Sequence, residues 1–370
     1  MRVCVVNDRF STSAPGGVYR IQGIAGALGE LGHEVVQVCP FFTVHGLGPY
    51  PDTISYGNRF TSFVWTPVDL VRRLRVVDAD VYLVELPFPW TKAFVGIAEA
   101  AFGNRVFLDF GESWVEAANR LHRRIATRVL RSALRSAIGA SATTAALRQA
   151  LIDLGRLGPE RVLYLPCGVA SDFLGMGPRA PDRSSARDGV VVGYMGTLSE
   201  AQGCRSLVDL VTQVHDARPD ARFLVVGDGP LLEPLRARAQ KSGLDGHISF
   251  TGGLPRSELP NLVRGMDIGL SLKPNRGTMT IGTFPQKIPE YMAVGCVPVS
   301  TPLLEARNII TDHVDGIISE VASMPDAIVS LLDDDATRKR MSAAAAASAR
   351  ARFRWSDLVT GLLDFWKRAG

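Results

Sequence analysis

The sequence predicts an α/β protein with two Rossmann-like domains, each built on a doubly wound parallel sheet. Its 370 residues are enough for two domains, since a domain usually holds about 100–200 residues. Short apolar runs, typical of buried parallel strands, alternate along the chain with segments of helical periodicity. Hydrophobic residues make up 46% of the sequence and charged residues 21%, which excludes general disorder.

The first series of strands and helices begins at the N-terminus. An apolar run at residues 3–6 is followed by a segment rich in Ser, Pro and Gly, a helical pattern over residues 18–31, and a second apolar run from Glu34 to Cys39. This order is one βαβ unit. Further strands are expected at residues 81–86, 106–110, 139–143 and 161–165. We therefore predict a first domain over residues 1–178.

A polar stretch at residues 178–188 holds few large apolar side chains, so we place the domain boundary there. The second domain, residues 189–354, repeats the alternation. Its strands are expected at residues 190–195, 222–226, 247–251, 268–272 and 297–300, and its helices at residues 205–217, 231–242, 256–264 and 286–293. Two such domains in series leave a cleft between them, where the carboxyl ends of both sheets can meet a ligand.

Charge and cysteine content exclude several classes of protein. Lys and Arg number 41 against 37 Asp and Glu, and a net charge of +4 does not suggest a nucleic-acid partner. The five cysteines are far apart and form no CxxC pair, so neither a metal site nor a disulfide framework is expected. No apolar stretch reaches the roughly 18 residues of a membrane span. We expect a cytoplasmic protein, with peripheral contact at the inner membrane face left open.

Three glycine-containing turns follow predicted strands. They lie at Gly16-Gly17, at Gly196 and at Gly227. Each alone is explained equally well by a tight turn, but three at the carboxyl ends of strands point to a nucleotide-sized cleft. The first lacks the GxGxxG pattern, which argues against an NAD site.

The segment from Thr283 to Val299 has the pattern of a loop, a short helix that ends at a glycine, and a strand. Lys287 and Glu290 are three residues apart and share one helix face. A lysine in the first turn can neutralise a phosphate, and a carboxylate one turn later can accept hydrogen bonds from two vicinal hydroxyls. The alternative is an ordinary surface ion pair.

From about residue 190 to 355 the chain resembles the donor-binding domain of glycosyltransferase family 4. The matching segments are residues 193–198, 222–230, 248–253, 255–259, 284–298, 331–334 and 352–355. The first domain matches more loosely, through Gly16-Gly17 and residues 31–35 and 165–169. The resemblance implies the GT-B fold, in which two Rossmann-like domains face each other across a cleft. It also implies that the last helix, from Trp355 onward, returns to the first domain.

The function implied by the resemblance is sugar transfer of the hexosyltransferase type. A nucleotide-sugar donor would give its sugar to a hydroxyl or amine of a small-molecule or lipid-linked acceptor, with retention. No metal and no cofactor is implied, because the nucleotide sugar is a substrate. Two alternatives stay open: a nucleotide-sugar epimerase of the same fold, and a catalytically degenerate binding protein.

The resemblance also implies the donor-binding residues. These are Gly16, Gly17, Gly196, Thr197, Gln202, Leu254, Thr283, Phe284, Lys287 and Glu290. Gly282 stands where the family usually has the first Glu of a Glu-x7-Glu pair, and Thr197 and Gln202 stand where it has an Arg and a Lys that clamp the diphosphate. A subgroup with a Pro-x-Lys-x-x-Glu-Tyr-Met-Ala segment is more similar. There Lys287 would take over the clamp, helped by Lys273 or Arg276.

Residues 109–116 follow a predicted strand and resemble the acidic, Trp-containing segment of this subgroup's acceptor cleft. Other family members have a histidine near this point, and this chain has Asp109 instead. We therefore predict Asp109 and Glu112 as catalytic residues. The alternative is a helix N-terminus with favourable acidic residues.

Arginines recur at steps of three and four between Arg120 and Arg135. This basic stripe could contact anionic lipid headgroups, as a surface amphipathic helix does. A solvated helix face is the more usual explanation. The full stripe is Arg120, Arg123, Arg124, Arg128, Arg131 and Arg135.

Overall fold

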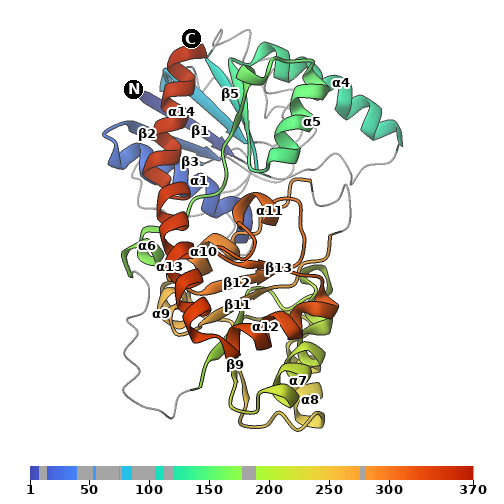
Figure 1. Ribbon diagram of the computed structural model, residues 1–370. Coiled ribbons are helices and arrows are strands. Elements are labelled where there is room, and N and C mark those ends of the chain that lie inside the picture. Colours follow the sequence, from blue (N-terminus) through green and yellow to red (C-terminus); the bar gives the residue numbers. More distant parts are fainter. Residues whose placement is uncertain are drawn as a thin grey trace. The chain divides into compact units, whose positions relative to one another are not determined.

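The chain folds into two units, each around its own parallel sheet (Figure 1). The computed structural model describes residues 1–7, 15–39, 53–55, 75, 77–85, 105–111, 120–176, 189–275 and 281–369. The first unit comprises residues 1–168, 281–284 and 355–370, and the second comprises residues 169–280 and 285–354. The predicted linker at residues 178–188 lies outside the described residues.

The first sheet has the strand order β3-β2-β1-β4-β5-β6-β7, with every neighbouring pair parallel. This order runs outward in both directions from β1, as in a doubly wound sheet. The strands are β1 (Arg2–Asn7), β2 (Glu34–Cys39), β3 (Thr53–Ser55), β4 (Val81–Glu85), β5 (Val106–Phe110), β6 (Gly139–Ala142) and β7 (Val162–Tyr164).

The helices of the first unit include one from the far end of the chain. They are α1 (Pro15–Glu30), α4 (Arg120–Ser136), α5 (Ala145–Gly155) and α14 (Trp355–Ala369). α14 lies against α1 (Figure 1), and its Phe365 and Trp366 meet the ring of Phe107 edge-on, with centroids 5.6 and 5.7 Å away. A side chain at Gly23 or Gly168 would collide with the indole of Trp355, so these glycines leave space for the start of α14.

α1 begins earlier than the sequence pattern predicts. The pattern places the first helical residue at position 18, whereas the helix starts at Pro15. Proline suits the first position of a helix, because its φ angle is already helical and its missing N–H would have no partner there. Gly16 and Gly17 therefore lie in the first turn of α1 and not in the preceding loop.

The second sheet has the order β10-β9-β8-β11-β12-β13, again with all neighbours parallel. Its strands are β8 (Val191–Met195), β9 (Arg222–Val226), β10 (Ile248–Gly252), β11 (Ile268–Ser271), β12 (Val297–Ser300) and β13 (Ile317–Ile318). The prediction of two Rossmann-like, doubly wound parallel-sheet domains is confirmed.

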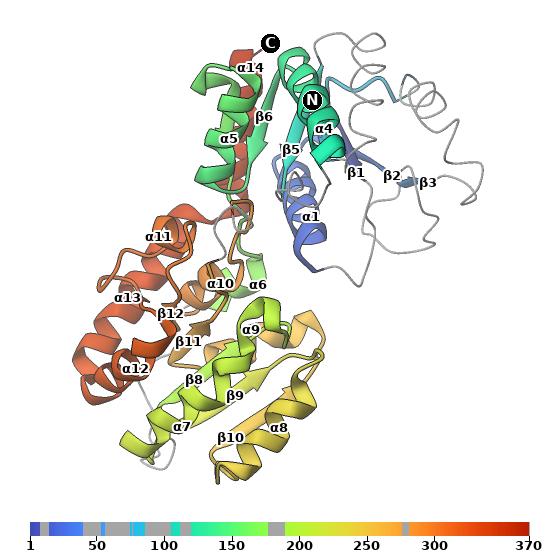
Figure 2. The same ribbon diagram turned by 90° about the vertical axis from the view of Figure 1, so that its right-hand side faces the viewer.

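Helices accompany the strands of the second unit (Figure 2). The α-helices are α6 (Ser171–Met176), α7 (Leu207–Ala217), α8 (Leu232–Lys241), α9 (Leu259–Arg264), α10 (Lys287–Ala293), α11 (Ala306–Ile309), α12 (Met324–Asp333) and α13 (Asp335–Arg352). Short 3-10 helices include η2 (Glu200–Gln202) and η4 (Arg256–Glu258). α6 belongs to this unit because it packs against α9 and α10.

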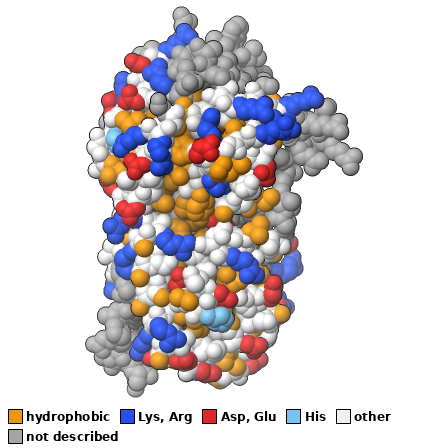
Figure 3. All heavy atoms as spheres, turned by 45° about the horizontal axis from the view of Figure 1, so that its top comes forward, with side chains coloured by type: hydrophobic (Ala, Val, Ile, Leu, Met, Phe, Trp, Pro, Cys, Tyr) orange, Lys and Arg blue, Asp and Glu red, His pale blue; other side chains and the backbone are white. Residues whose placement is uncertain are grey.

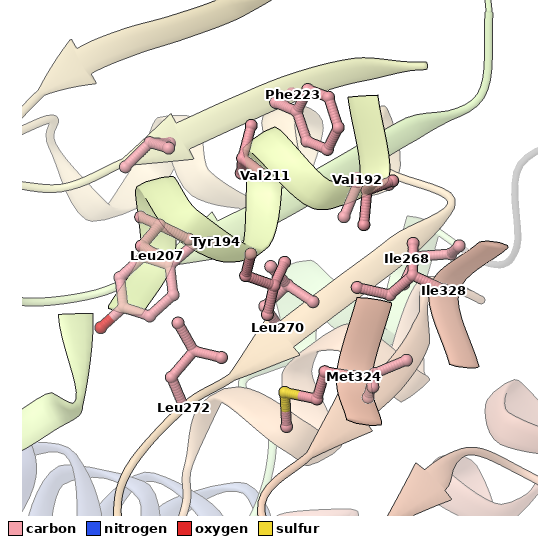
Figure 4. Close-up of a cluster of buried hydrophobic side chains, with 14 of the residues drawn as sticks. Val192, Tyr194, Leu207, Val211, Phe223, Ile268, Leu270, Leu272, Met324 and Ile328 are labelled. Carbon is pink, nitrogen blue, oxygen red and sulfur yellow. The ribbon is translucent and has the colours of Figure 1, made fainter. Parts of the chain in front are cut away.

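The core of the second unit fills the layer between its sheet and two helices. Figure 4 shows Val192, Phe223 and Ile268 of the strands packed with side chains of α7 and α12. On these strands the apolar residues are nearly continuous, as expected for strands covered on both faces. Among the described residues, no helix has both the length and the apolar character needed to cross a bilayer.

Candidate functional site

Two tight turns meet at the carboxyl edge of the second sheet, after β8 and β9. Gly196 has a φ of +135° and Gly227 a φ of +140°, values that only glycine adopts readily. The Gly196 N–H donates to the Val226 carbonyl at 2.9 Å. A Cβ on Gly227 would lie 2.0 Å from the Gly196 carbonyl oxygen, so the turns can pack together only because that side chain is absent.

Gly227→Ala is expected to lower the free energy of unfolding of the second unit by about 1–3 kcal/mol, because both φ and the contact with Gly196 become strained. Urea denaturation measures the loss. Gly243→Ala is the matched control, since Gly243 also has a positive φ (+70°) but a Cβ there would meet nothing within 4 Å. Equal losses in the two variants would contradict a close approach of the two turns.

Lys287 is the first residue of α10, and its side chain lies beside the backbone of Gly196, which carries no side chain. Its Nζ is 4.0 Å from the centroid of the Tyr194 ring, and a Cβ on Gly196 would lie 3.0 Å from the same nitrogen. The pKa of Lys287 is lowered to about 8, chiefly by burial; Cys204 and Glu290 oppose this effect and Lys273 adds to it. A half-buried ammonium group next to unobstructed backbone suits an anionic ligand.

Glu290 lies one turn further along α10 and is only 2% exposed. Its Oε1 accepts a hydrogen bond from Arg256 Nη2 at 2.6 Å, and Gln286 also donates to its carboxylate. Burial raises the pKa of Glu290, and Arg256 opposes that rise. The carboxylate is thus held by two donors in a site that water scarcely reaches.

The position of α10 is set by Tyr291, which is fully buried. Its hydroxyl accepts from the Met195 N–H at 2.7 Å and donates to the Leu270 carbonyl at 3.3 Å. A Cβ on Gly269 would lie 2.6 Å from the Tyr291 ring, so the glycine lets the helix approach β11 closely. These contacts hold Lys287 and Glu290 at the carboxyl edge of the sheet.

The other predicted donor-binding residues are spread more widely. Thr197 is exposed in the turn after β8, Gln202 ends η2, and Leu254 and Lys273 are half-buried after β10 and β11. Gly16, Gly17, Thr283 and Phe284 belong to the first unit. Arg276 lies outside the described residues. The structure therefore brings together Gly196, Lys287 and Glu290, with Lys273 close enough to affect the pKa of Lys287.

Asp109, which is predicted from the sequence to be catalytic, lies inside the first unit. It shares with Phe107 the face of β5 that α1 and α14 cover, because alternate residues of a strand point the same way. Arg20 Nε and Nη2 donate to its two carboxylate oxygens at 2.7 and 2.6 Å, and Ser141 also donates to it. Arg20 and Asp109 side chains are 1% and 0% exposed, so the pair is internal.

Three charged residues near the predicted ones were not expected from the sequence: Arg20, Glu85 and Arg256. Glu85 ends β4 half-exposed, and a Cβ on Gly111 would lie 2.9 Å from its Oε1, so it lies at the carboxyl edge of the first sheet. Its position as a carboxylate ending a strand was a detectable signal. Glu112, the second predicted catalytic residue, lies outside the described residues, and so does the rest of its acidic segment.

Two arginines of the basic stripe are already engaged. Arg131 Nε donates to the Leu154 carbonyl at 2.9 Å and Arg135 Nε to the Gly155 carbonyl at 3.0 Å, which satisfies the last turn of α5. Arg128 is exposed. On the face shown in Figure 3, Lys and Arg side chains are interspersed with Asp and Glu over most of the surface, and a group of Lys and Arg side chains lies at the upper right. The part of α4 whose side chains are described thus packs as an ordinary domain helix.

Comparison with known proteins gives a match to a family model within the second unit. Residues 189–334 match the family model described as "Glycosyl transferases group 1". The 2-deoxystreptamine glucosyltransferase of Streptomyces kanamyceticus is 33% identical over 162 residues, which cover 42% of this chain and 41% of that protein. The phosphatidyl-myo-inositol mannosyltransferase of Mycobacterium leprae is 29% identical over 230 residues, covering 60% and 58%. The chain spans about half the length of the curated relatives it matches.

Solved structures are similar over the whole chain. The structure of Anabaena Alr3699/HepE in complex with UDP has a TM-score of 0.77 at 17% identity and covers 100% of both chains. Sucrose-phosphate synthase from Thermosynechococcus elongatus has a TM-score of 0.74 at 15% identity and covers 100% of this chain and 98% of that one. The protein thus has the GT-B fold, and its residues 189–334 match the model of the group 1 glycosyltransferases.

Proposed function

We propose that the protein is a glycosyltransferase that moves a sugar from a nucleotide-sugar donor to a hydroxyl or amine of a small-molecule or lipid-linked acceptor. The observation that carries the proposal is the placement of Lys287 and Glu290 on one turn of α10, beside the bare backbone of Gly196. That position is the carboxyl edge of a doubly wound sheet, where such folds bind nucleotides. The names of the relatives support the reaction class.

Each residue has a distinct proposed task. Lys287, with Lys273, would counter the charge of the donor's diphosphate, whose departure needs electrostatic stabilisation. Glu290 would accept hydrogen bonds from the ribose hydroxyls. In this proposal residues 285–293 are the signature of the subgroup in which a lysine at this point replaces the usual clamp. Retention, and chemistry without metal or cofactor, rest on the family resemblance.

Two further parts of the proposal concern the surroundings of the enzyme. The cytoplasmic location rests on the sequence. The proposed peripheral membrane contact rests on the arginines of α4. Because Arg131 and Arg135 donate hydrogen bonds to α5, fewer of these arginines are available to bind lipid headgroups.

The main competing function is a degenerate protein that binds a nucleotide sugar without transferring it. The neutral Thr197 and Gln202 and the buried Gly282 favour it, since each stands where the family usually has a charged group. An epimerase is not favoured, because the relatives are named as transferases. Incubation with a panel of nucleotide sugars and of candidate acceptors distinguishes the candidates: a transferase releases nucleoside diphosphate and passes the sugar to its acceptor, and a degenerate binder retains the donor intact.

Glu290→Gln is expected to weaken the binding of a nucleoside and of its diphosphate equally, by about 1.5 kcal/mol, because a charge-assisted hydrogen bond to the ribose is lost. Titration calorimetry with UDP, GDP and their nucleosides measures the effect. Glu233→Gln is the control, since Glu233 is an exposed residue of α8. Wild-type binding by the Glu290 variant would place the donor site elsewhere.

A further inference from the structure

We propose that Arg256 is a positioning residue for Glu290: the ion pair fixes the carboxylate that would receive the donor's ribose, and the ring of Phe173 fixes Arg256 in turn. The inference rests on the proposed function, because it assigns a task within the same nucleotide site. It joins three elements, η4, α10 and α6, through one chain of contacts.

The contacts run from α6 to the carboxylate. Phe173 is fully buried, and the guanidinium carbon of Arg256 lies 5.6 Å from the centroid of its ring. Arg256 then reaches Glu290 Oε1 at 2.6 Å. The Arg256 side chain is 25% exposed and that of Glu290 3%, so the ion pair is largely shielded from water. The contact with the Phe173 ring lies within cation–π distance and adds a second restraint on the guanidinium.

The ion pair also bears on the charge of Glu290. Around this carboxylate, burial and the negative Asp172 of α6 raise the pKa of Glu290, while Arg256 and Gln286 lower it. The Lys287 ammonium is the other charged group that interacts with it. An ionised carboxylate can accept hydrogen bonds from two hydroxyls with both of its oxygens, whereas protonation removes the charge and turns one oxygen into a donor. Arg256 therefore favours the form of Glu290 that binds ribose.

Removal of Arg256 should then make ribose binding depend on pH. Without the guanidinium the Glu290 pKa rises, and nucleoside affinity falls as the pH drops through it, until the side chain is neutral. The probes are uridine and guanosine, whichever the wild type binds, because they carry no phosphate to titrate. We expect Arg256→Gln to bind the nucleoside more weakly at pH 5.5 than at pH 8, by up to about tenfold, which is the loss expected for a neutral side chain at position 290, while the wild type changes less.

Three further variants identify the groups involved. Arg256→Gln combined with Glu290→Gln should show weak binding that no longer varies with pH, because an amide does not titrate. Arg256→Lys keeps the charge but loses the planar contacts, so it should restore the flat pH profile with reduced affinity. Phe173→Leu removes the ring under Arg256 and should weaken nucleoside binding. If Arg256→Gln does not fold, Phe173→Leu still tests whether the position of Arg256 affects nucleoside binding.

Arg236→Gln is the matched control, since Arg236 forms an exposed ion pair with Glu233 at 2.8 Å in the same unit. It should leave the profile unchanged. If Arg256→Gln and Phe173→Leu both bind the nucleoside with the wild-type affinity and pH profile, the positioning role is overturned. If the wild type binds neither nucleosides nor UDP or GDP, the proposed function fails instead, so the two failures are distinct.

Discussion

Asp109→Asn is expected to lower the free energy of unfolding of the first unit by about 3–5 kcal/mol, because it leaves Arg20 buried without its counter-charge. Burial by itself lowers the pKa of Arg20, but Asp109, together with Cys167 and Glu85, raises it by more, so the guanidinium stays charged inside the fold. Arg20 also donates to the Leu165 carbonyl at 2.7 Å and to the Pro166 carbonyl at 3.3 Å. The pair thus ties α1 to β5 and to the chain after β7.

The control for this variant is Glu34→Gln, which removes an ion pair with Arg2 at the surface of the same unit. There both partners are solvated, with 41% and 56% of the side chains exposed, and the loss should stay below about 1 kcal/mol. Replacing both members of the internal pair, as Arg20→Met with Asp109→Leu, should cost less than Asp109→Asn alone. Chemical denaturation measures all three. If Asp109→Asn is as stable as the wild type but has lost transfer activity, the result would support the catalytic role that the sequence predicts for Asp109.

Lys287→Met is expected to weaken the binding of UDP or GDP by about 1.5–3 kcal/mol while leaving the nucleoside nearly unaffected, because only the diphosphate meets the ammonium charge. The lowered pKa gives a second, independent signature. At pH 8, close to the pKa of about 8, roughly half of the free protein has a neutral Lys287. A bound diphosphate favours the charged form, so binding should take up about half a proton at this pH, and affinity should fall as the pH rises further.

Calorimetry in buffers of different ionisation enthalpy measures this proton uptake. Lys287→Arg should abolish it while keeping much of the affinity, since a guanidinium remains protonated throughout. Lys241→Met, at the exposed end of α8, should behave as the wild type. Proton uptake that persists in Lys287→Arg would show that another group titrates on binding, and Lys287 would then not be the diphosphate contact.

The strands and the two-domain order could be predicted from local pattern, since buried parallel strands are apolar throughout and helices repeat every 3.6 residues. The short strands β3 and β13 were missed. β13 has only two residues, too few to show a periodicity. The early start of α1 at Pro15 was also missed. A stretch rich in Ser, Pro and Gly is typical of a loop, and only the structure shows that this proline occupies the first helical position.

At the candidate site, the sequence alone determined that Lys287 and Glu290 share a helix face at the end of a strand series, because a separation of three residues is a local property of the helix. Only the tertiary structure decided what those side chains meet. Glu290 is paired with Arg256, 34 residues away, and Asp109 with Arg20, 89 residues away. A carboxylate after a strand reads as accessible in sequence, but whether it faces water or a buried arginine depends on which helix covers that face of the sheet.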